Sequence, residues 1–296
     1  MKESVFSGID SMHGDDKKRY SGIVCIAGRP NTGKSTLLNR IVNRKISIVS
    51  DKPQTTRDRI IGIYTKDSKQ IIFYDTPGIG EGRGRLSGEM NRIAEETMTG
   101  ADLYLFVIDG SSGFNRDDAS ILTKLSYTGR PVVAVLNKSD KTGEAALVPS
   151  ADILRKQKAV SEIIPVSAKT GDNVDSLIPL LLNELPENPL IFDEGTVTDQ
   201  PPAFIISEFV REQIYINSYN EIPYGVSVSV RRLEYSESGD IQASCEIFAE
   251  KQAHKKILIG RGGALLKKIR RFAERRLKEF FTVSVKLELW VRIPGN

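Results

Sequence analysis

Apolar segments of strand length recur through the first two thirds of the chain, with helix-length amphipathic segments between most of them. The apolar segments lie at 22–28, 60–67, 70–76, 103–110, 131–137 and 162–168. Several consist almost wholly of Val, Ile and Leu, which is typical of strands buried on both faces of a sheet. The alternation predicts an α/β domain with a mostly parallel sheet and helices on both faces. A short Asp-Ser turn joins the second and third segments, so one strand is expected to be antiparallel.

The pattern changes after residue 184. A proline- and acid-rich stretch at 185–202 is typical of a linker. The elements predicted beyond it are a helix at 207–221, strands at 226–235 and 241–250, two basic helices around 260–263, and a strand at 283–293. Their order predicts a smaller α+β domain. The boundaries that we expect are a disordered tail at 1–20, a first domain at 21–184, the linker at 185–202 and a second domain at 203–296.

The composition is that of an ordinary globular protein, with 40% hydrophobic and 27% charged residues. Cys25 and Cys245 lie far apart in apolar runs, so buried thiols are expected rather than a disulfide framework. No run of roughly 18 apolar residues, the length of a membrane span, occurs in the sequence. The polar first 20 residues do not resemble a secretory signal. A cytoplasmic protein is therefore expected.

Positive charge is concentrated in the second part of the chain. Residues 1–200 carry 26 Lys and Arg against 27 Asp and Glu, a net charge of −1. Residues 201–296 carry 16 against 11, a net charge of +5. This asymmetry predicts a polyanionic partner for the second domain.

Residues 28–35 read GRPNTGKS and fit the phosphate-loop pattern G-x-x-x-x-G-K-S. They follow a predicted strand and begin a predicted helix, the context in which backbone N–H groups surround a phosphate. Lys34 is expected to reach the β- and γ-phosphate oxygens, and Ser35 to coordinate Mg²⁺. The predicted phosphate-binding residues are Gly28, Arg29, Pro30, Asn31, Thr32, Gly33, Lys34, Ser35 and Thr36.

Two further segments are predicted to respond to the γ-phosphate. Asp75, at a strand end, is expected to hold Mg²⁺ through water, and the Gly78 amide to meet the γ-phosphate. A loop before the second strand is expected to supply a threonine ligand to Mg²⁺, for which we favour Thr56 over Thr55. The predicted switch I residues are Gln54, Thr55, Thr56, Arg57 and Asp58, and the predicted switch II residues are Asp75, Thr76, Pro77, Gly78 and Ile79.

The purine base is predicted to be guanine. Asn137-Lys138-Ser139-Asp140 follows a buried strand. A carboxylate at Asp140 can accept hydrogen bonds from guanine N1 and N2, which adenine does not offer, while the Lys138 stem lies along the base. Ser167-Ala168-Lys169 ends the last predicted strand, where the Ala168 amide can donate to guanine O6. The predicted guanine-binding residues are Asn137, Lys138, Asp140, Ser167, Ala168 and Lys169, and they indicate a GTP site.

Ten Lys and Arg and one acidic residue lie between His254 and Lys278, around a glycine-rich turn. A G-x-x-G turn between two helices lets an RNA backbone approach closely and is typical of KH domains. The predicted RNA-binding residues are Gly260, Arg261, Gly262, Gly263, Lys267, Lys268, Arg270 and Arg271. A solvated helix face and a basic helix on anionic lipid are the alternatives. Ile257 and Trp290 are expected in the core of this domain.

The motifs GRPNTGKS, PQTTRDR, DTPGI, NKSD and VSAK together resemble the Era family of bacterial GTPases. VTDQPPAFIISEFVRE, EIPYGVSVSV and HKKILIGRGGALLKKI are similar to the linker and C-terminal KH domain of that family. The resemblance covers the chain from about residue 22 to residue 293. It implies a P-loop GTPase domain followed by a type II KH domain. The glycine- and arginine-rich segment 80–85 departs from the family pattern.

The resemblance also implies a function. It implies a slowly hydrolysing GTP switch that binds the 3′ end of small-subunit (16S) ribosomal RNA and assists 30S subunit assembly. It further implies peripheral association with the inner face of the cell membrane, and we expect a monomer. A membrane-associated signalling GTPase whose basic domain contacts phospholipid is the competing hypothesis.

Ile79 stands where Ras-like GTPases have a glutamine that orients the attacking water. Members of the resembled family also have an apolar residue there, and several have an asparagine at the position of Asn31 that helps to bind K⁺. The resemblance therefore implies K⁺, beside Mg²⁺, as a source of positive charge in the transition state. The alternative is that Asn31 only shapes the loop by capping its own backbone.

Overall fold

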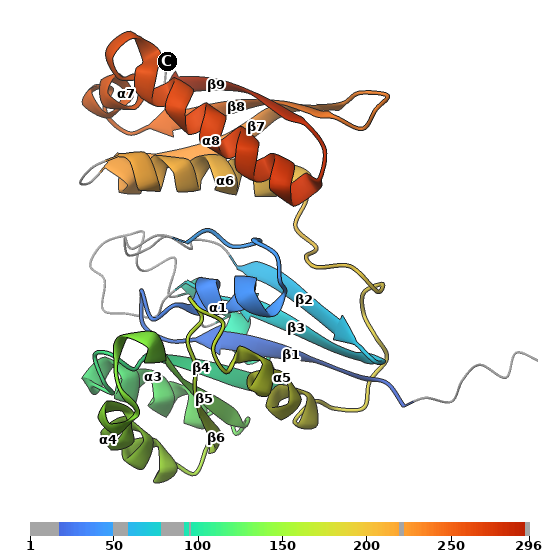
Figure 1. Ribbon diagram of the computed structural model, residues 1–296, viewed down its shortest axis with the longest axis vertical. Coiled ribbons are helices and arrows are strands. Elements are labelled where there is room, and N and C mark those ends of the chain that lie inside the picture. Colours follow the sequence, from blue (N-terminus) through green and yellow to red (C-terminus); the bar gives the residue numbers. More distant parts are fainter. Residues whose placement is uncertain (1–17, 50–58, 78–91, 95, 219–221, 294–296) are drawn as a thin grey trace, which may run out of the picture.

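The computed structural model describes residues 18–49, 59–77, 92–94, 96–218 and 222–293. Figure 1 shows two domains joined by one extended segment. Most of the expected tail lies outside the described residues. The same is true of seven predicted switch residues: Gln54, Thr55, Thr56, Arg57, Asp58, Gly78 and Ile79.

The first domain is built on a six-stranded sheet with the order β2-β3-β1-β4-β5-β6. The strands are β1 (Tyr20–Ala27), β2 (Ile60–Lys66), β3 (Lys69–Asp75), β4 (Leu103–Asp109), β5 (Val132–Asn137) and β6 (Val160–Pro165). β2 is antiparallel to β3, and the other neighbouring strands are parallel. This confirms the predicted mostly parallel sheet, with its one antiparallel strand at an edge.

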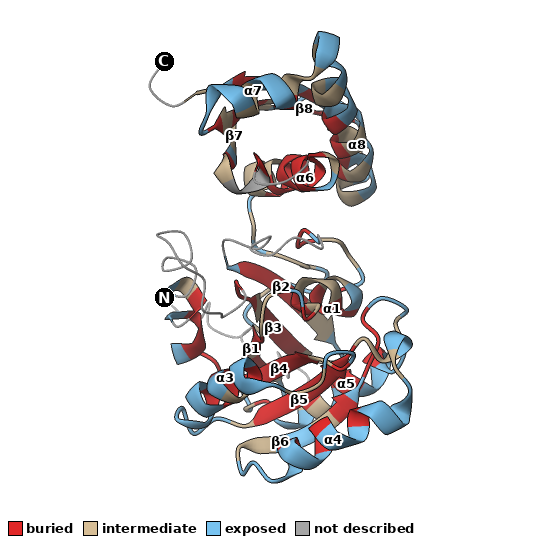
Figure 2. Cartoon of the chain, turned by 90° about the vertical axis from the view of Figure 1, so that its left-hand side faces the viewer, coloured by how far each residue is buried: buried red, intermediate tan, exposed pale blue. Residues whose placement is uncertain are grey.

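Helices cover both faces of this sheet. α1 (Lys34–Ile41) and α5 (Val174–Asn183) pack on one face, and α3 (Arg116–Ser126) and α4 (Glu144–Arg155) on the other. Strand side chains alternate between the two layers, so Val24 and Ile26 face α1 and α5 while Cys25 faces α3 and α4. Figure 2 shows the resulting buried layer along the central strands. Burying each such side chain stabilises the fold by about 1.5–3 kcal/mol.

The second domain has the order helix–strand–strand–helix–helix–strand. Its elements are α6 (Pro202–Asn217), β7 (Val226–Tyr235), β8 (Ile241–Ala249), α7 (Gln252–Ile259), α8 (Ala264–Phe281) and β9 (Val285–Arg292). β7 is antiparallel and β9 parallel to β8. One hydrophobic core joins α6 and α8 to one face of this sheet. The order confirms the predicted α+β KH domain of type II.

The first helix of the second domain begins and ends earlier than the sequence predicted. α6 begins at Pro202 and ends at Asn217, rather than spanning 207–221. Proline suits the first turn of a helix because it has no N–H to leave unpaired and its φ is already helical.

Trp290 and Ile257 were expected in the core, and this prediction is wrong. Trp290 is 57% and Ile257 48% exposed. Trp290 alternates with the buried Val291 along β9, so its ring lies on the face of the sheet opposite the helices.

The segment between α5 and α6 is attached to the edge of the first sheet. Gln70 of β3 accepts hydrogen bonds from the backbone N–H groups of Ile191 (2.9 Å) and Phe192 (3.0 Å). Val197 O accepts from the N–H of Ile63 in the edge strand β2, at 2.9 Å. The linker therefore covers a sheet edge that would otherwise expose unpaired backbone groups.

Both cysteines are free and buried, as expected. Burial raises the pKa of the Cys25 and Cys245 thiols to about 12.

Candidate functional site

The predicted nucleotide-binding residues come together at the carboxyl ends of the parallel strands. This edge of an open α/β sheet is where such folds bind ligands. A pocket of about 560 Å³ opens there. It is lined by Asn31, Gly33, Thr36, Val49, Asn137, Lys138, Asp140, Lys141, Ala168 and Lys169. All of these except Val49 and Lys141 are predicted by the sequence motifs.

The loop between β1 and α1 requires glycine at two positions. Gly28 has φ 148°, and a Cβ there would lie 2.3 Å from Val107 O. Gly33 has φ 97°, and a Cβ there would lie 2.2 Å from Asn137 Nδ2. Non-glycine residues are strained in this region of φ, and neither neighbour has room for a Cβ. The pattern G-x-x-x-x-G thus follows from how closely the loop approaches β4 and β5.

Lys34 lies inside this loop. Its Nζ donates to Gly28 O at 3.0 Å and to Arg29 O at 2.8 Å. Burial lowers the pKa of Lys34 to about 8, and the nearby Asp75 carboxylate opposes that shift. The ammonium group is therefore fixed in the centre of a loop built to surround an anion.

Arg29 and Thr32 shape the loop from outside the pocket. The Arg29 guanidinium pairs with the buried Asp118 of α3 at 2.8 Å, and the Thr32 hydroxyl donates to Arg29 O at 3.1 Å. Only the backbone of Arg29 is thus placed to contact a phosphate. The ion pair fixes the loop against α3.

Asp75 lies fully buried at the end of β3. Its Oδ2 accepts from Ser35 Oγ at 2.6 Å and from Ser47 Oγ at 2.9 Å, and its Oδ1 has no hydrogen-bond partner among the described residues. Burial raises the pKa of this carboxyl, against the opposing effects of Ser35, Lys34 and Ser47.

An unpaired buried carboxylate oxygen beside a serine hydroxyl suits a hard cation that prefers oxygen ligands. The predicted Mg²⁺ ligands Ser35 and Asp75 are therefore brought together, whereas Thr56 lies outside the described residues. The sequence motifs did not indicate Ser47. Thr76, a predicted switch II residue, donates to Ile26 O at 2.9 Å and so closes the end of β1.

Asn137 connects the phosphate loop to the turn after β6. Its Nδ2 donates to Thr32 O at 2.7 Å, and its Oδ1 accepts from the Ala168 N–H at 2.9 Å. The Ala168 amide was predicted to donate to guanine O6. In this structure the Ala168 N–H donates to Asn137 Oδ1 instead. The predicted hydrogen bond to guanine O6 would therefore require this N–H to be shared with Asn137 or to leave it.

Lys138 and Asp140 both line the pocket where the base is predicted to bind. Lys138 Nζ donates to Asn31 O at 2.7 Å and pairs with Asp109 at 2.6 Å. Ser167 Oγ donates to one oxygen of Asp140 at 2.7 Å, which fixes the orientation of that carboxylate. The site can therefore present a fixed acceptor to a base with two adjacent donors.

Arg40 of α1 contacts the turn after β6 that contains Lys169. Its guanidinium donates to Lys169 O at 2.7 Å. No local sequence motif indicates that Arg40 and Asp109 belong to the site, because both contact segments that are distant in the sequence.

The glycine-rich turn lies between α7 and α8. Gly260, Gly262 and Gly263 have φ values of 73°, 59° and 77°. A Cβ at Gly262 or Gly263 would meet nothing within 4 Å. These two glycines are thus needed for backbone conformation and leave open space for an approaching chain.

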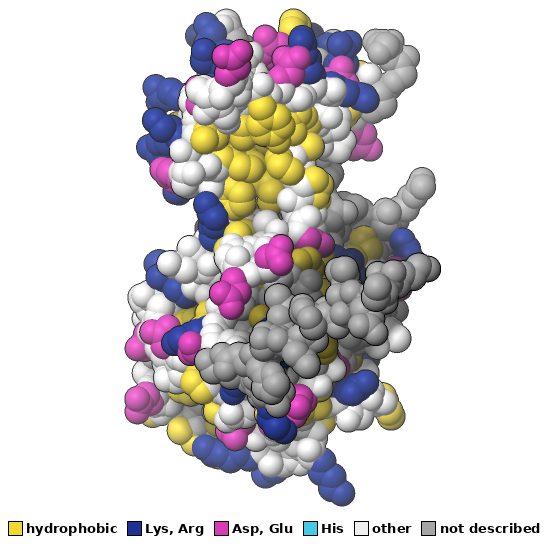
Figure 3. Space-filling view, turned by 90° about the vertical axis from the view of Figure 1, so that its right-hand side faces the viewer, with side chains coloured by type: hydrophobic (Ala, Val, Ile, Leu, Met, Phe, Trp, Pro, Cys, Tyr) yellow, Lys and Arg dark blue, Asp and Glu magenta, His cyan; other side chains and the backbone are white. Residues whose placement is uncertain are grey.

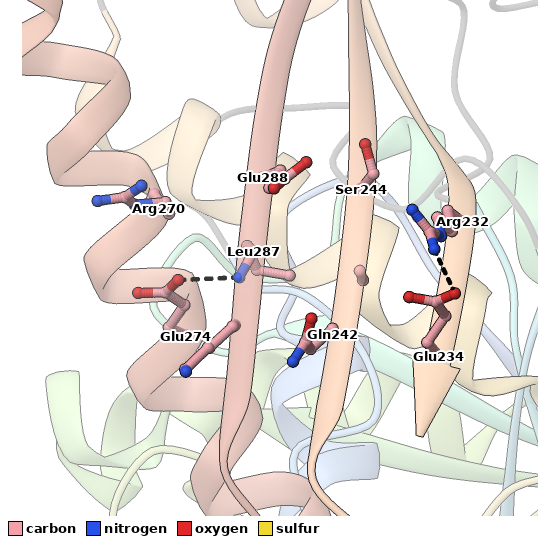
Figure 4. Close-up of a pocket in the computed structure, with 10 residues that line it drawn as sticks. Arg232, Glu234, Gln242, Ser244, Arg270, Glu274, Leu287 and Glu288 are labelled. Carbon is pink, nitrogen blue, oxygen red and sulfur yellow. Dashed lines mark hydrogen bonds and ion pairs between the residues drawn. The ribbon is translucent and has the colours of Figure 1, made fainter. Parts of the chain in front are cut away.

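The four basic residues predicted to bind RNA after the turn are exposed: Lys267, Lys268, Arg270 and Arg271. With about 100° between successive residues of a helix, Lys267 and Arg271 lie side by side on α8, while Lys268 and Arg270 lie about 160° apart. Arg270 lies beside β9 and Glu274, and Glu274 accepts from the Leu287 N–H at 2.9 Å (Figure 4). Figure 3 shows Lys and Arg side chains gathered along one edge and the top of the second domain. The four residues thus cannot all face the same RNA segment.

Comparison with known proteins agrees with this architecture. A family model described as 50S ribosome-binding GTPase matches residues 23–138, and one described as KH domain matches residues 221–296. The chain is 42% identical to GTPase Era of Alkaliphilus oremlandii over 277 residues, covering 93% of this chain and 94% of the relative. It is 37% identical to GTPase Era of Halothermothrix orenii over 281 residues, with 93% and 94% covered.

Two solved structures match with a TM-score of 0.88, each at 36% identity and covering 93% of this chain and 94% of theirs. One is a variant of Aquifex aeolicus Era bound to GDP and AlF₄⁻. The other is Era in complex with MgGDPNP and nucleotides 1506–1542 of 16S ribosomal RNA.

Fold and site define a P-loop GTPase, which hydrolyses GTP to GDP and phosphate, joined to a KH RNA-binding domain. The chain belongs to the Era family of GTPases.

We expect the Asp140 carboxylate to select guanine. Asp140→Asn should lower GTP affinity by about tenfold to a hundredfold, because an amide cannot accept from both guanine donors. It should admit xanthosine triphosphate, whose carbonyl at position 2 suits an amide donor. Competition against a fluorescent GDP analogue measures both. Asp172→Asn, an exposed change in the neighbouring turn, is the control. Unchanged nucleotide preference in Asp140→Asn would show that another group reads the base.

Proposed function

We propose that this chain is a slowly hydrolysing GTP switch that binds the 3′ end of 16S ribosomal RNA through its KH domain. In this role it assists assembly of the 30S subunit as a monomer in the cytoplasm. The glycine-rich turn between α7 and α8 carries the proposal, because it combines open backbone with exposed basic side chains. The solved Era complex with a 16S segment, which matches along 93% of this chain, supports the choice of RNA.

Each part of the nucleotide site has a defined task in this proposal. The backbone of residues 28–36 and Lys34 bind the phosphates. Ser35 and Asp75 hold Mg²⁺, which offsets the negative charge that develops on the phosphate oxygens during transfer. Asp140, fixed by Ser167, reads the base. Asn137 holds the loops that carry these groups at their working separation.

Asn31 is proposed to be a ligand of K⁺. It lines the pocket beside the phosphate loop, and its backbone adopts a left-handed φ of 63°. Asparagine tolerates this conformation, so shaping of the loop accounts for the residue equally well. A cation at this position would supply the positive charge that an arginine finger supplies in other GTPases.

Hydrolysis should therefore be faster in KCl than in NaCl at equal ionic strength. Asn31→Gly removes the amide and keeps the left-handed conformation, so it should abolish the difference while preserving GDP affinity. Phosphate release under single-turnover conditions measures the rate in each salt. Equal rates of the unmodified protein in both salts would leave only the loop-shaping role for Asn31.

Contact with a membrane is the second proposed interaction, and the structure limits its form. No helix in the described ranges is long and apolar enough to cross a membrane. A helix that lies in the interface needs a free apolar face, but Ile269, Ala273 and Leu277 of α8 are buried in the domain core. Any contact of α8 with anionic lipid would therefore be electrostatic. Co-flotation with anionic vesicles, compared with co-sedimentation with 30S subunits, ranks the two partners.

RNA binding at the turn should be sensitive to charge at Gly263. This residue is left-handed and faces open space, and both Asp and Asn tolerate that conformation. Gly263→Asp should abolish binding to a single-stranded 16S 3′-end RNA, because the carboxylate repels the phosphates. Gly263→Asn, its uncharged counterpart of the same size, should lose much less. Filter binding gives the affinities, and GTP hydrolysis without RNA should be unchanged in both variants. Equal RNA affinity in the Asp and Asn variants would place the RNA elsewhere.

A further inference from the structure

Glu212 is a buried carboxylate of the KH domain whose strongest partners belong to the GTPase domain. Its side chain, on α6, is 1% exposed. Oε2 accepts from Lys45 Nζ at 2.6 Å, and Oε1 accepts from the Val49 N–H at 3.0 Å. Within its own helix it has only a long contact of 3.5 Å with Gln213 Nε2. In Figure 1, α6 is the KH element that faces the GTPase domain.

The segment that Glu212 binds leads directly into the nucleotide site. Val49, whose N–H donates to Glu212, lines the nucleotide pocket. Two residues earlier, Ser47 Oγ donates to Asp75, the proposed Mg²⁺ ligand, at 2.9 Å. Asn39 of α1 fixes the backbone at and just before Ser47, since its Oδ1 accepts from the N–H groups of Ile46 (2.8 Å) and Ser47 (2.9 Å). The short segment 47–49 is therefore hydrogen-bonded to the KH domain at Val49 and to the buried Asp75 carboxylate at Ser47.

We propose that Glu212 is a positioning residue for the magnesium site, acting through Lys45, Val49 and Ser47. The KH domain thereby helps to set how firmly the GTPase domain holds Mg²⁺ and its nucleotide, even without RNA. The inference rests on the proposed assignment of Asp75 to Mg²⁺ and is independent of which RNA the KH domain binds.

The chemistry of the contact favours this role over simple adhesion between domains. Losing one donor while the domains stay together leaves a buried carboxylate partly unpaired, which is strongly unfavourable. The two hydrogen bonds of Glu212, from Lys45 and from Val49, should therefore form together and break together. Such two-state behaviour is what a contact that couples two domains requires. Ser47 holds Asp75 by one oxygen and leaves the other without a partner among the described residues, so the carboxylate is pre-oriented toward a cation.

The test is the dependence of nucleotide release on free Mg²⁺ in the full-length chain without RNA. The release rate of a fluorescent GDP analogue is measured across a series of free Mg²⁺ concentrations. The midpoint is the Mg²⁺ concentration at which the slowing of release is half complete. Glu212→Gln, Lys45→Met and Ser47→Ala should each raise that midpoint, by about 2- to 30-fold. Glu212→Gln combined with Ser47→Ala should raise it by less than the product of the single effects, because both act on one path.

Two controls separate this effect from general damage. Glu208→Gln breaks a buried ion pair with Arg211 within α6, and among the described residues Glu208 makes no hydrogen bond or ion pair with the segment 45–49. Arg44→Met removes the hydrogen bond from Arg44 to Phe280 O, an interdomain contact that leads to neither Asp75 nor the pocket. Both variants should keep the midpoint of the unmodified protein.

A shift in either control as large as that of Glu212→Gln would overturn the proposal, as would an unchanged midpoint in Glu212→Gln and Lys45→Met. Fully multiplicative effects of Glu212→Gln and Ser47→Ala would also overturn it. If Mg²⁺ fails to slow release from the unmodified protein, the assignment of Asp75 to Mg²⁺ falls first and the inference falls with it. If only RNA binding fails, the proposed function falls and the Mg²⁺ result still stands.

Discussion

The two hydrogen bonds of the Asn137 side-chain amide constrain the whole nucleotide site. One fixes the phosphate loop at Thr32 O, and the other fixes the turn after β6 at the Ala168 N–H. Because Asn137 ends β5, the register of the parallel sheet sets where both loops lie. The close approach of Gly33 to this amide, which leaves no room for a Cβ, is part of the same constraint. Asp140, with its carboxylate held by Ser167, then lies at the position predicted for the base.

In the part of the chain that the structure describes, a few polar contacts and the packing of Phe204 and Phe280 against the first core join the two domains. The core of the second domain is closed by α6, α8 and its own sheet, while the outer sheet face and the basic face of α8 remain exposed. Apart from the linker, the polar contacts among the described residues are those of Arg44 with α8 and of the segment 45–49 with α6. This segment also holds Asp75 through Ser47. One short stretch of chain therefore connects the site of phosphate chemistry with the domain that binds RNA.

Local patterns in the sequence were enough to predict the mostly parallel sheet, its one antiparallel strand, the domain order and most of the pocket. Each of these is encoded by neighbours in the chain: periodicity for the strands, and short motifs at strand ends for Asn137, Lys138 and Asp140. Ser47, Arg40 and Glu212 were missed because their partners lie far away in sequence. Trp290 was misassigned because a large aromatic residue suggests a core, whereas strand alternation turns it outward. The sequence also did not show that the Ala168 N–H donates to Asn137, because this hydrogen bond joins two segments that meet only in the folded chain.

The central claim is that the Asn137 amide holds the nucleotide site together, and the affinity of Asn137→Asp for GDP tests it most directly. Aspartate has the same shape and can still accept from the Ala168 N–H, but it cannot donate to Thr32 O and places oxygen against oxygen there. GDP affinity, measured by calorimetry, should fall by about 1.5–3 kcal/mol, tenfold to more than a hundredfold. GDP affinity equal to that of the unmodified protein, in a variant that folds normally, would contradict the account.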